Sequence, residues 1–322
     1  LKLIDELPQI SITQSEQDSL IYNTAFIKFS ELEYKTASIA FEKYIEKFEE
    51  GIFIQDAIYY NAVSLLNVFD TSGAITMYEK LVESSNLLYQ QEALSFLART
   101  YYSRRDYMTS NNYYKKIYNL NMNHSLKRES VVRLMYINEY IDSSAAFNYA
   151  KEVVSLDKKD DWLLSRAKII IARNQFLQGN YSKSRITFSE VLKLSAHDEG
   201  AEAKYYLCYF AYLDDSLDLA ENMIFELVEN YDNDYFIANA FILLADIYVL
   251  KANMFQAKAT LESVIENCEI DEIVHLSQKK WESIVQKEIN DEQQNISESY
   301  IDITDEDIDY IIEEFDMQDS VK

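Results

Sequence analysis

Residues that interrupt helices are rare in this sequence. The 322-residue chain has one proline and four glycines, well below the average of roughly 5% and 7% for these residue types. Hydrophobic residues nevertheless make up 48% of the chain, and 26 positions are tyrosine. A chain with few turn residues and ample material for a core is predicted to be all-helical.

Basic residues are also scarce compared with acidic ones. Lysine and arginine number 30 against 55 aspartate and glutamate residues, a formal net charge of −25. The negative electrostatic potential of such a chain repels a phosphate backbone unless a local basic patch dominates. We therefore expect no nucleic-acid partner. The one stretch that keeps this alternative open is residues 98–118, where six tyrosines lie among basic residues that include Arg99, Arg104, Arg105, Lys115 and Lys116.

Signals for membranes and export are missing. No run of about 18 apolar residues occurs, so we expect no membrane-spanning segment. The chain starts at Leu1, and no basic and apolar leader with a cleavage site is present. We expect the chain to be a mature fragment or an excised region of a longer protein.

The residue types that carry most enzyme chemistry are few and scattered. Cys208 and Cys268 lack metal-ligand spacing, and we expect two free and mostly buried thiols. His124, His197 and His275 are isolated from one another and from any metal motif. The four glycines form no phosphate-binding loop. We therefore expect no enzymatic activity, no metal site and no cofactor.

An internal repeat runs through most of the chain. Small residues recur every 36 to 38 positions, at Ala37, Ala74, Ser110, Ala146, Ser184, Ala220 and Ala257. The residues four, seven and eight positions later are mostly large and apolar, the spacing of one buried helix face. A second set of markers precedes the first by twelve positions, at Ala25, Ala62, Ala98, Leu134, Ala172, Cys208 and Ala245. Each unit is thus predicted to be two antiparallel helices that approach closely and are joined by a short turn.

These units resemble tetratricopeptide repeats (TPRs). In "LLADIYVLKANMFQAKATLESVI" the family's positions are held by Ala245, Tyr248, Ala257 and Leu261, and the segment 98–114 and the turn 179–184 match in the same way. The resemblance covers roughly residues 16–268, or about seven units. The period exceeds the family's usual length of about 34 residues, and the proline that usually closes each unit is absent. The resemblance implies an all-α solenoid with a right-handed superhelix and a non-enzymatic protein-binding role.

The links between units carry a looser resemblance. "FEKYIEKFEEGIFIQDAIYYNAVSLL" and "IFELVENYDNDYFIANAFILLADIY" look like the unit boundary of bacterial envelope TPR proteins, such as the lipoprotein of the outer-membrane assembly machine and the Tol-Pal-associated periplasmic protein. Here the loop proline of those families is replaced by residues 49–51 and 232–234. This resemblance implies a periplasmic or other cell-envelope location, in an assembly or secretion complex at the outer membrane. A cytoplasmic location remains the alternative.

Segments of other kinds flank the repeats. Residues 1–15 are an N-terminal segment or the end of a preceding repeat, and residues 269–290 predict a capping helix. Residues 291–322 contain twelve acidic residues against one lysine, so an acidic tail is expected. Within this tail Ile308, Ile311, Ile312 and Phe315 share one helix face. The tail is either solvated or a short amphipathic helix that docks on a partner or on this chain's own groove.

The resemblance also points to a binding groove. In a superhelix of paired helices, the first helices line the concave face. Three positions of each unit are expected there: Tyr22, Phe26, Phe29; Tyr59, Val63, Leu66; Ser95, Arg99, Tyr102; Val131, Met135, Asn138; Ile169, Arg173, Phe176; Tyr205, Tyr209, Tyr212; Ile242, Asp246, Val249. This face is more apolar and aromatic than a solvated helix face.

Tyrosine and arginine most often anchor interfaces. The predicted partner-binding residues are therefore Tyr59, Arg99, Tyr102, Arg173, Tyr205, Tyr209 and Tyr212, and the expected partner is a protein, held as an extended peptide or a helix. Two alternatives remain open. Tight winding would bury these residues against neighbouring repeats, or the chain would be a structural section of a larger repeat protein joined through its end faces.

Overall fold

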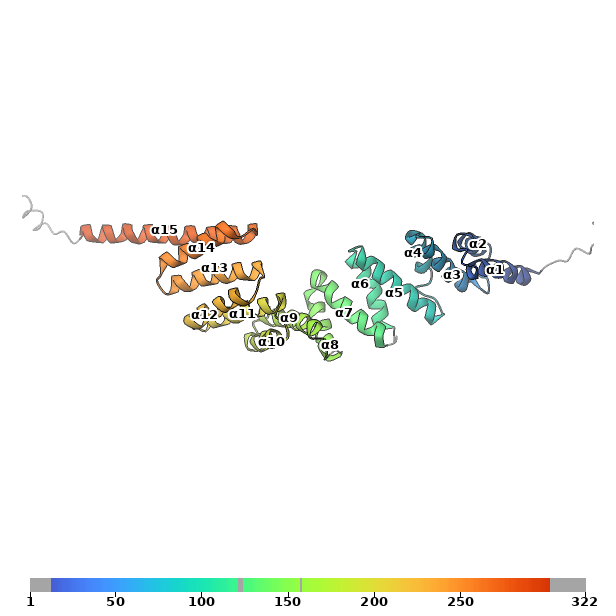
Figure 1. Ribbon diagram of the computed structural model, residues 1–322, viewed down its shortest axis with the longest axis horizontal. Coiled ribbons are helices and arrows are strands. Elements are labelled where there is room, and N and C mark those ends of the chain that lie inside the picture. Colours follow the sequence, from blue (N-terminus) through green and yellow to red (C-terminus); the bar gives the residue numbers. More distant parts are fainter. Residues whose placement is uncertain (1–12, 121–123, 157, 302–322) are drawn as a thin grey trace, which may run out of the picture. The chain divides into compact units, whose positions relative to one another are not determined.

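The computed structural model describes residues 13–120, 124–156 and 158–301. In these ranges the chain forms fifteen α-helices and no strand (Figure 1), which confirms the expected all-α fold. Two compact units are distinguished, Leu1–Lys158 and Lys159–Lys322. None of the helices in the described ranges is long and apolar enough to cross a membrane.

The first unit contains eight helices. They are α1 (Gln14–Ser30), α2 (Tyr34–Lys47), α3 (Ile54–Asn67), α4 (Thr71–Glu79), α5 (Leu87–Ser103), α6 (Tyr107–Asn119), α7 (His124–Ile141) and α8 (Ser143–Leu156). Each helix packs against the next one along the chain. The odd-numbered helix is the first of each helix pair, and we call each such pair a hairpin.

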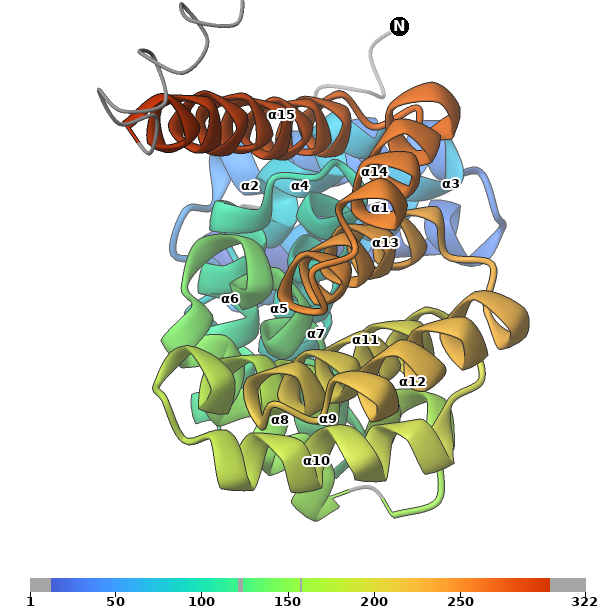
Figure 2. The same ribbon diagram turned by 90° about the vertical axis from the view of Figure 1, so that its left-hand side faces the viewer.

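The second unit continues the same pattern. Its helices are α9 (Asp161–Leu177), α10 (Tyr181–Leu194), α11 (Asp198–Leu213), α12 (Leu217–Asn230), α13 (Asp234–Leu250), α14 (Met254–Asn267) and α15 (Asp271–Ile301). Successive helices pack together, and α9, α11, α13 and α15 also contact one another in turn (Figure 2). The expected capping helix is α15, which packs on α13 and α14 and continues beyond residue 290. The segment of Ile308, Ile311, Ile312 and Phe315 lies outside the described residues.

The small marker residues lie where the two helices of a hairpin touch. All fourteen markers expose at most 1% of their surface. In two hairpins the contact includes a hydrogen bond between markers, since the Ser110 hydroxyl donates to the Ala98 carbonyl and the Ser184 hydroxyl to the Ala172 carbonyl, both at 2.9 Å. Except for Leu134 in the α7–α8 hairpin, these positions hold Ala, Ser or Cys, since a larger side chain there would separate the helix axes.

The turn inside most hairpins has a left-handed residue five positions before the marker of the hairpin's second helix. Leu32, Phe69, Arg105, Asp215 and Ala252 have φ between 53° and 64°, and Gly179 has φ 74°. The N–H of this residue and that of the next one cap the carbonyls of the preceding helix, as in the bonds from Leu32 to Phe29 and from Glu33 to Lys28. This is the usual glycine-favouring end of a helix, but glycine occupies only one of these six turns.

Candidate functional site

The seven predicted partner-binding residues all lie on first helices of hairpins, but in two separate units. Tyr59 is on α3, and Arg99 and Tyr102 are on α5 of the first unit. The remaining four are in the second unit, with Arg173 on α9 and Tyr205, Tyr209 and Tyr212 on α11. The structure therefore groups them by unit, and each group has its own surroundings.

The first of the three expected groove positions is mostly covered. Buried residues hold it in five hairpins, namely Tyr22, Ser95, Val131, Ile169 and Ile242, whereas Tyr59 and Tyr205 are half-buried. In the second unit the first helices of adjacent hairpins also contact one another. At this position most side chains are therefore not open to a partner.

Both predicted arginines pair with a carboxylate of the next first helix. Arg99 donates to Glu129 of α7 through Nε at 2.7 Å and Nη2 at 2.5 Å. Arg173 makes the same two-pronged contact with Glu202 of α11, where the Nη2 bond measures 2.5 Å. The Arg99 bond, opposed by burial, holds the pKa of Glu129 below its usual value. These arginines thus connect adjacent hairpins.

The predicted tyrosines of the first unit also contact neighbouring helices. The Tyr59 ring stacks on Tyr89 of α5 with centroids 4.4 Å apart. The guanidinium of Arg133 on α7 lies 4.6 Å from the centroid of the Tyr102 ring, whose edge also meets Tyr107. Cation–π and stacked contacts of this kind hold rings in fixed positions. In the first unit the predicted residues therefore serve the packing of its own hairpins.

The tyrosines of the second unit form an aromatic surface across three helices. On α11, the rings of Tyr209 and Tyr212 lie 6.1 Å apart, and Phe176 of α9 lies 5.8 Å from Tyr209. Tyr205 extends the row towards α13, where Phe236 lies 5.9 Å away. We call Phe176, Tyr205, Tyr209 and Tyr212 the aromatic face.

The hydroxyl groups of the tyrosines have different surroundings. In several structural tyrosines the hydroxyl donates to a carboxylate on another helix: Tyr44 to Asp18, Tyr89 to Asp56, Tyr118 to Glu152 and Tyr248 to Glu221. Within the described residues, the hydroxyls of Tyr205, Tyr209 and Tyr212 make no hydrogen bond, and none of them is a fully buried oxygen. Burial raises the pKa of Tyr205 and of Tyr212, so both remain protonated donors at neutral pH.

Ion pairs border the aromatic face on both sides. Arg173, Tyr209 and Asp246 each follow the marker of their own helix by one position, so they form one row across α9, α11 and α13. Arg173 is paired with Glu202, and Asp246 with Lys280 of α15 at 2.6 Å. The two charges that flank the tyrosines are thus neutralised within the unit.

Sequence reasoning missed the carboxylate partners of the two arginines. Glu129 follows Arg99 by 30 residues and Glu202 follows Arg173 by 29. An acidic residue slightly less than one period after an arginine was the available signal. In a chain this rich in carboxylates, many positions satisfy it by chance.

The cysteines and the other possible metal ligands of the described residues are not gathered into a site. Cys208 is buried, Cys268 is half-buried and both are free thiols, and burial raises the pKa of Cys208 to about 12. In the ranges that the structure covers, no three His, Cys, Asp or Glu side chains gather in a way that would hold a metal ion.

Comparison with known proteins gives matches among solved structures alone. No protein-family model matches the chain, and no curated protein matches it. A tetratricopeptide repeat protein from Parabacteroides merdae matches with 12% identity over 83% of this chain and 98% of its own, at a TM-score of 0.38. The C-terminal part of a TPR repeat-containing protein from Cytophaga hutchinsonii matches with 13% identity over 79% and 98%, at a TM-score of 0.47.

A third match is YrrB, described as a TPR protein with an unusual peptide-binding site, with 16% identity over 74% of this chain and 98% of its own, at a TM-score of 0.36. Because these scores are low, the assignment rests on the chain's own features: hairpins of two helices, buried small markers at their crossing and a first helix that contacts the next first helix. The described residues have the fold of tetratricopeptide-type helical repeats.

Proposed function

We propose that the chain is a non-enzymatic protein-binding scaffold whose second unit holds a partner, as an extended peptide or a helix, on the aromatic face. The observation that carries this proposal is the cluster of aromatic rings on α9 and α11, in which Phe176 lies 5.8 Å from Tyr209 and Tyr209 lies 6.1 Å from Tyr212. The hydroxyls of Tyr205, Tyr209 and Tyr212 make no hydrogen bond within the described residues, as is also true of Tyr59 and Tyr102, so they can bond a partner.

The chemistry of the face favours a peptide-like partner. The rings of Tyr209, Tyr212 and Phe176 offer rigid apolar area, and the hydroxyls can donate to backbone carbonyls. Tyrosine is enriched among the residues that dominate interface energies because it combines area with a polar group and loses little side-chain entropy. The charges beside the face are paired, so they contribute orientation more than net attraction.

The contacts within each unit reduce the number of predicted partner-binding residues. Tyr59, Arg99 and Tyr102 are engaged by Tyr89, Glu129 and Arg133 of their own unit. We therefore assign partner contact to Tyr205, Tyr209 and Tyr212. Arg173 acts as a positioning residue, because its bond to Glu202 ties α9 to α11.

A peptide-display selection on the full chain tests the proposal. Selected peptides should lose about tenfold or more in affinity for the double variant Tyr209→Ala/Tyr212→Ala, since a dominant interface residue contributes about 2 kcal/mol. The matched control is Tyr140→Ala, which removes an exposed tyrosine of α7. Unchanged affinity in the double variant, with helicity preserved, would contradict the proposal.

A further inference from the structure

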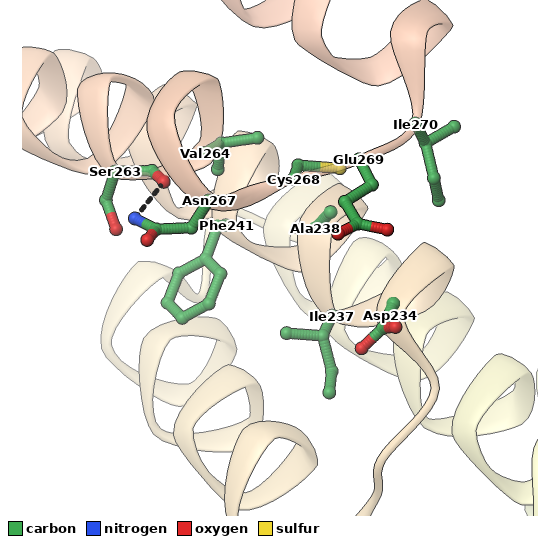
Figure 3. Close-up of a pocket in the computed structure, with 10 residues that line it drawn as sticks. All are labelled: Asp234, Ile237, Ala238, Phe241, Ser263, Val264, Asn267, Cys268, Glu269 and Ile270. Carbon is green, nitrogen blue, oxygen red and sulfur yellow. Dashed lines mark hydrogen bonds between the residues drawn. The ribbon is translucent and has the colours of Figure 1, made fainter.

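The hairpin of α13 and α14 carries an apolar pocket that the aromatic face does not include. Its volume is about 630 Å³, and it lies between the first half of α13, the end of α14 and the loop into α15 (Figure 3). Ile237, Ala238 and Phe241 line it from α13, and Val264 and Cys268 from the other side. A second pocket of about 300 Å³ shares Phe241 and Ser263 with it. We call the two together the α13–α14 groove.

This groove exists where the hairpin differs from the two hairpins that precede it in the second unit. Lys168 of α9 and Lys204 of α11 each lie four positions before the marker of their own helix, Ala172 and Cys208. Lys204 bonds Glu226 of its hairpin's second helix at 2.5 Å, and Lys168 bonds Glu190 at the equivalent place.

The α13–α14 hairpin has Phe241 and Ser263 at these two positions. A polar bridge that spans the two helices is therefore replaced by an aromatic ring and a short hydroxyl, and a pocket opens beside the ring.

A third position differs in the same direction. Cys268 lies eleven residues after Ala257, the marker of α14. At the equivalent place the α1–α2 hairpin has the buried Phe48 and the α11–α12 hairpin has Tyr231, whereas the α9–α10 hairpin has the small Ser195. A thiol fills less volume than an aromatic ring. Both changes leave apolar atoms of α13 and α14 open to a ligand.

The charge at the groove selects its occupant. Asp234 and Glu269 line the larger pocket, and Figure 3 shows both carboxylates at the end remote from Phe241. Among the described residues that line the two pockets, none is basic. Residues 302–322 of this chain contain nine acidic residues and one lysine, so their charge opposes binding beside these carboxylates.

We propose that the α13–α14 groove binds a partner protein's segment in which apolar side chains alternate with lysine or arginine. An apolar side chain of that segment packs against Phe241, and its cations pair with Asp234 and Glu269. The groove is a second binding surface, because no residue of the aromatic face lines either pocket.

The test titrates the full chain with a labelled synthetic peptide of alternating leucine and lysine, beside the same peptide with glutamate for lysine and a peptide of residues 302–322. The groove-closing variant is Phe241→Lys/Ser263→Glu, which copies the pair found in the two preceding hairpins. Alkylation of Cys268 localises the binding, because this thiol lines the pocket while Cys208 is buried.

We expect the lysine peptide to bind, to slow the alkylation of Cys268, and to lose about tenfold or more in affinity for the groove-closing variant. Asp234→Asn/Glu269→Gln should weaken it too. Glu42→Gln/Glu46→Gln, an equal charge change at exposed positions of α2, should not.

Other results overturn the proposal. These are equal weakening by the two charge variants, no protection of Cys268, or tighter binding of the glutamate or tail peptide. Tyr209→Ala/Tyr212→Ala should leave the lysine peptide's affinity unchanged, so a failure of the groove is distinguishable from a failure of the aromatic face.

Discussion

Phe69 has a backbone conformation that suits glycine, and this makes the energetic cost of a turn measurable. Its φ is 64°, and 94% of the side chain is exposed. A left-handed conformation costs a residue with a Cβ about 1–2 kcal/mol. Because the ring has little contact to lose, replacement by glycine should recover most of that strain.

The expected gain is smaller than the strain itself. Glycine is more flexible in the unfolded chain, which offsets the gain by about 0.5–1 kcal/mol. Phe69→Gly should therefore stabilise the first unit by about 0.5–1 kcal/mol and raise its Tm by about 1–4 °C. Differential scanning calorimetry and urea unfolding of the same variant measure both quantities.

Gly179 allows the reverse substitution as a control. It has φ 74°, and a Cβ added there would meet no atom within 4 Å. Gly179→Ala therefore changes the backbone preference alone and should destabilise the second unit by about 0.5–1 kcal/mol. A destabilised Phe69→Gly variant together with a neutral Gly179→Ala variant would refute the assignment of left-handed strain to these turns.

Three further outcomes are expected. Arg173→Ala leaves Glu202, which exposes 4% of its surface, without its cation. This variant should lose about 3 kcal/mol of unfolding free energy in urea titrations. Arg99→Ala should lose less than about 1 kcal/mol, because the Arg99 side chain is 57% exposed. Arg99 lowers the pKa of Glu129 from its ordinary value of 4.5. The stabilisation by this ion pair is therefore complete above pH 4.5 and is lost as the pH falls through the lowered pKa. The unfolding curves of the parent and of Arg99→Ala should converge on acidification. Ala172→Leu at a helix crossing should cost about 1–3 kcal/mol through overpacking, and a neutral calorimetric result would contradict the role of the markers.

The repeat was the most predictable part of the fold. Where two helices cross, the contact favours small side chains, and this preference recurs in every hairpin except at Leu134 of α7. Residues such as Ala98 and Ser184 therefore reveal the hairpins in the sequence. The left-handed turn residues were hidden, because Leu32, Phe69 or Arg105 at such a place looks like an ordinary loop residue and no glycine marks it.

The candidate site was only partly predictable. The expected groove treated each first helix as packed on one side. In the second unit, however, first helices of adjacent hairpins are in contact, and Ile169 and Ile242 are buried. Whether a tyrosine hydroxyl has an acceptor depends on residues about 30 positions away, so Tyr89 and Tyr209 look alike in the sequence. The envelope location and the right-handed superhelix stay predictions.

The bonds between consecutive first helices have a mechanical consequence. The spacing and tilt of neighbouring hairpins depend partly on side-chain tethers, of which Arg99 with Glu129 and Lys280 with Asp246 are partly exposed ion pairs. Salt weakens such tethers far more than it weakens the buried alanine crossings inside a hairpin. Each unit should thus act as an elastic element whose joints soften with ionic strength while its hairpins keep their shape.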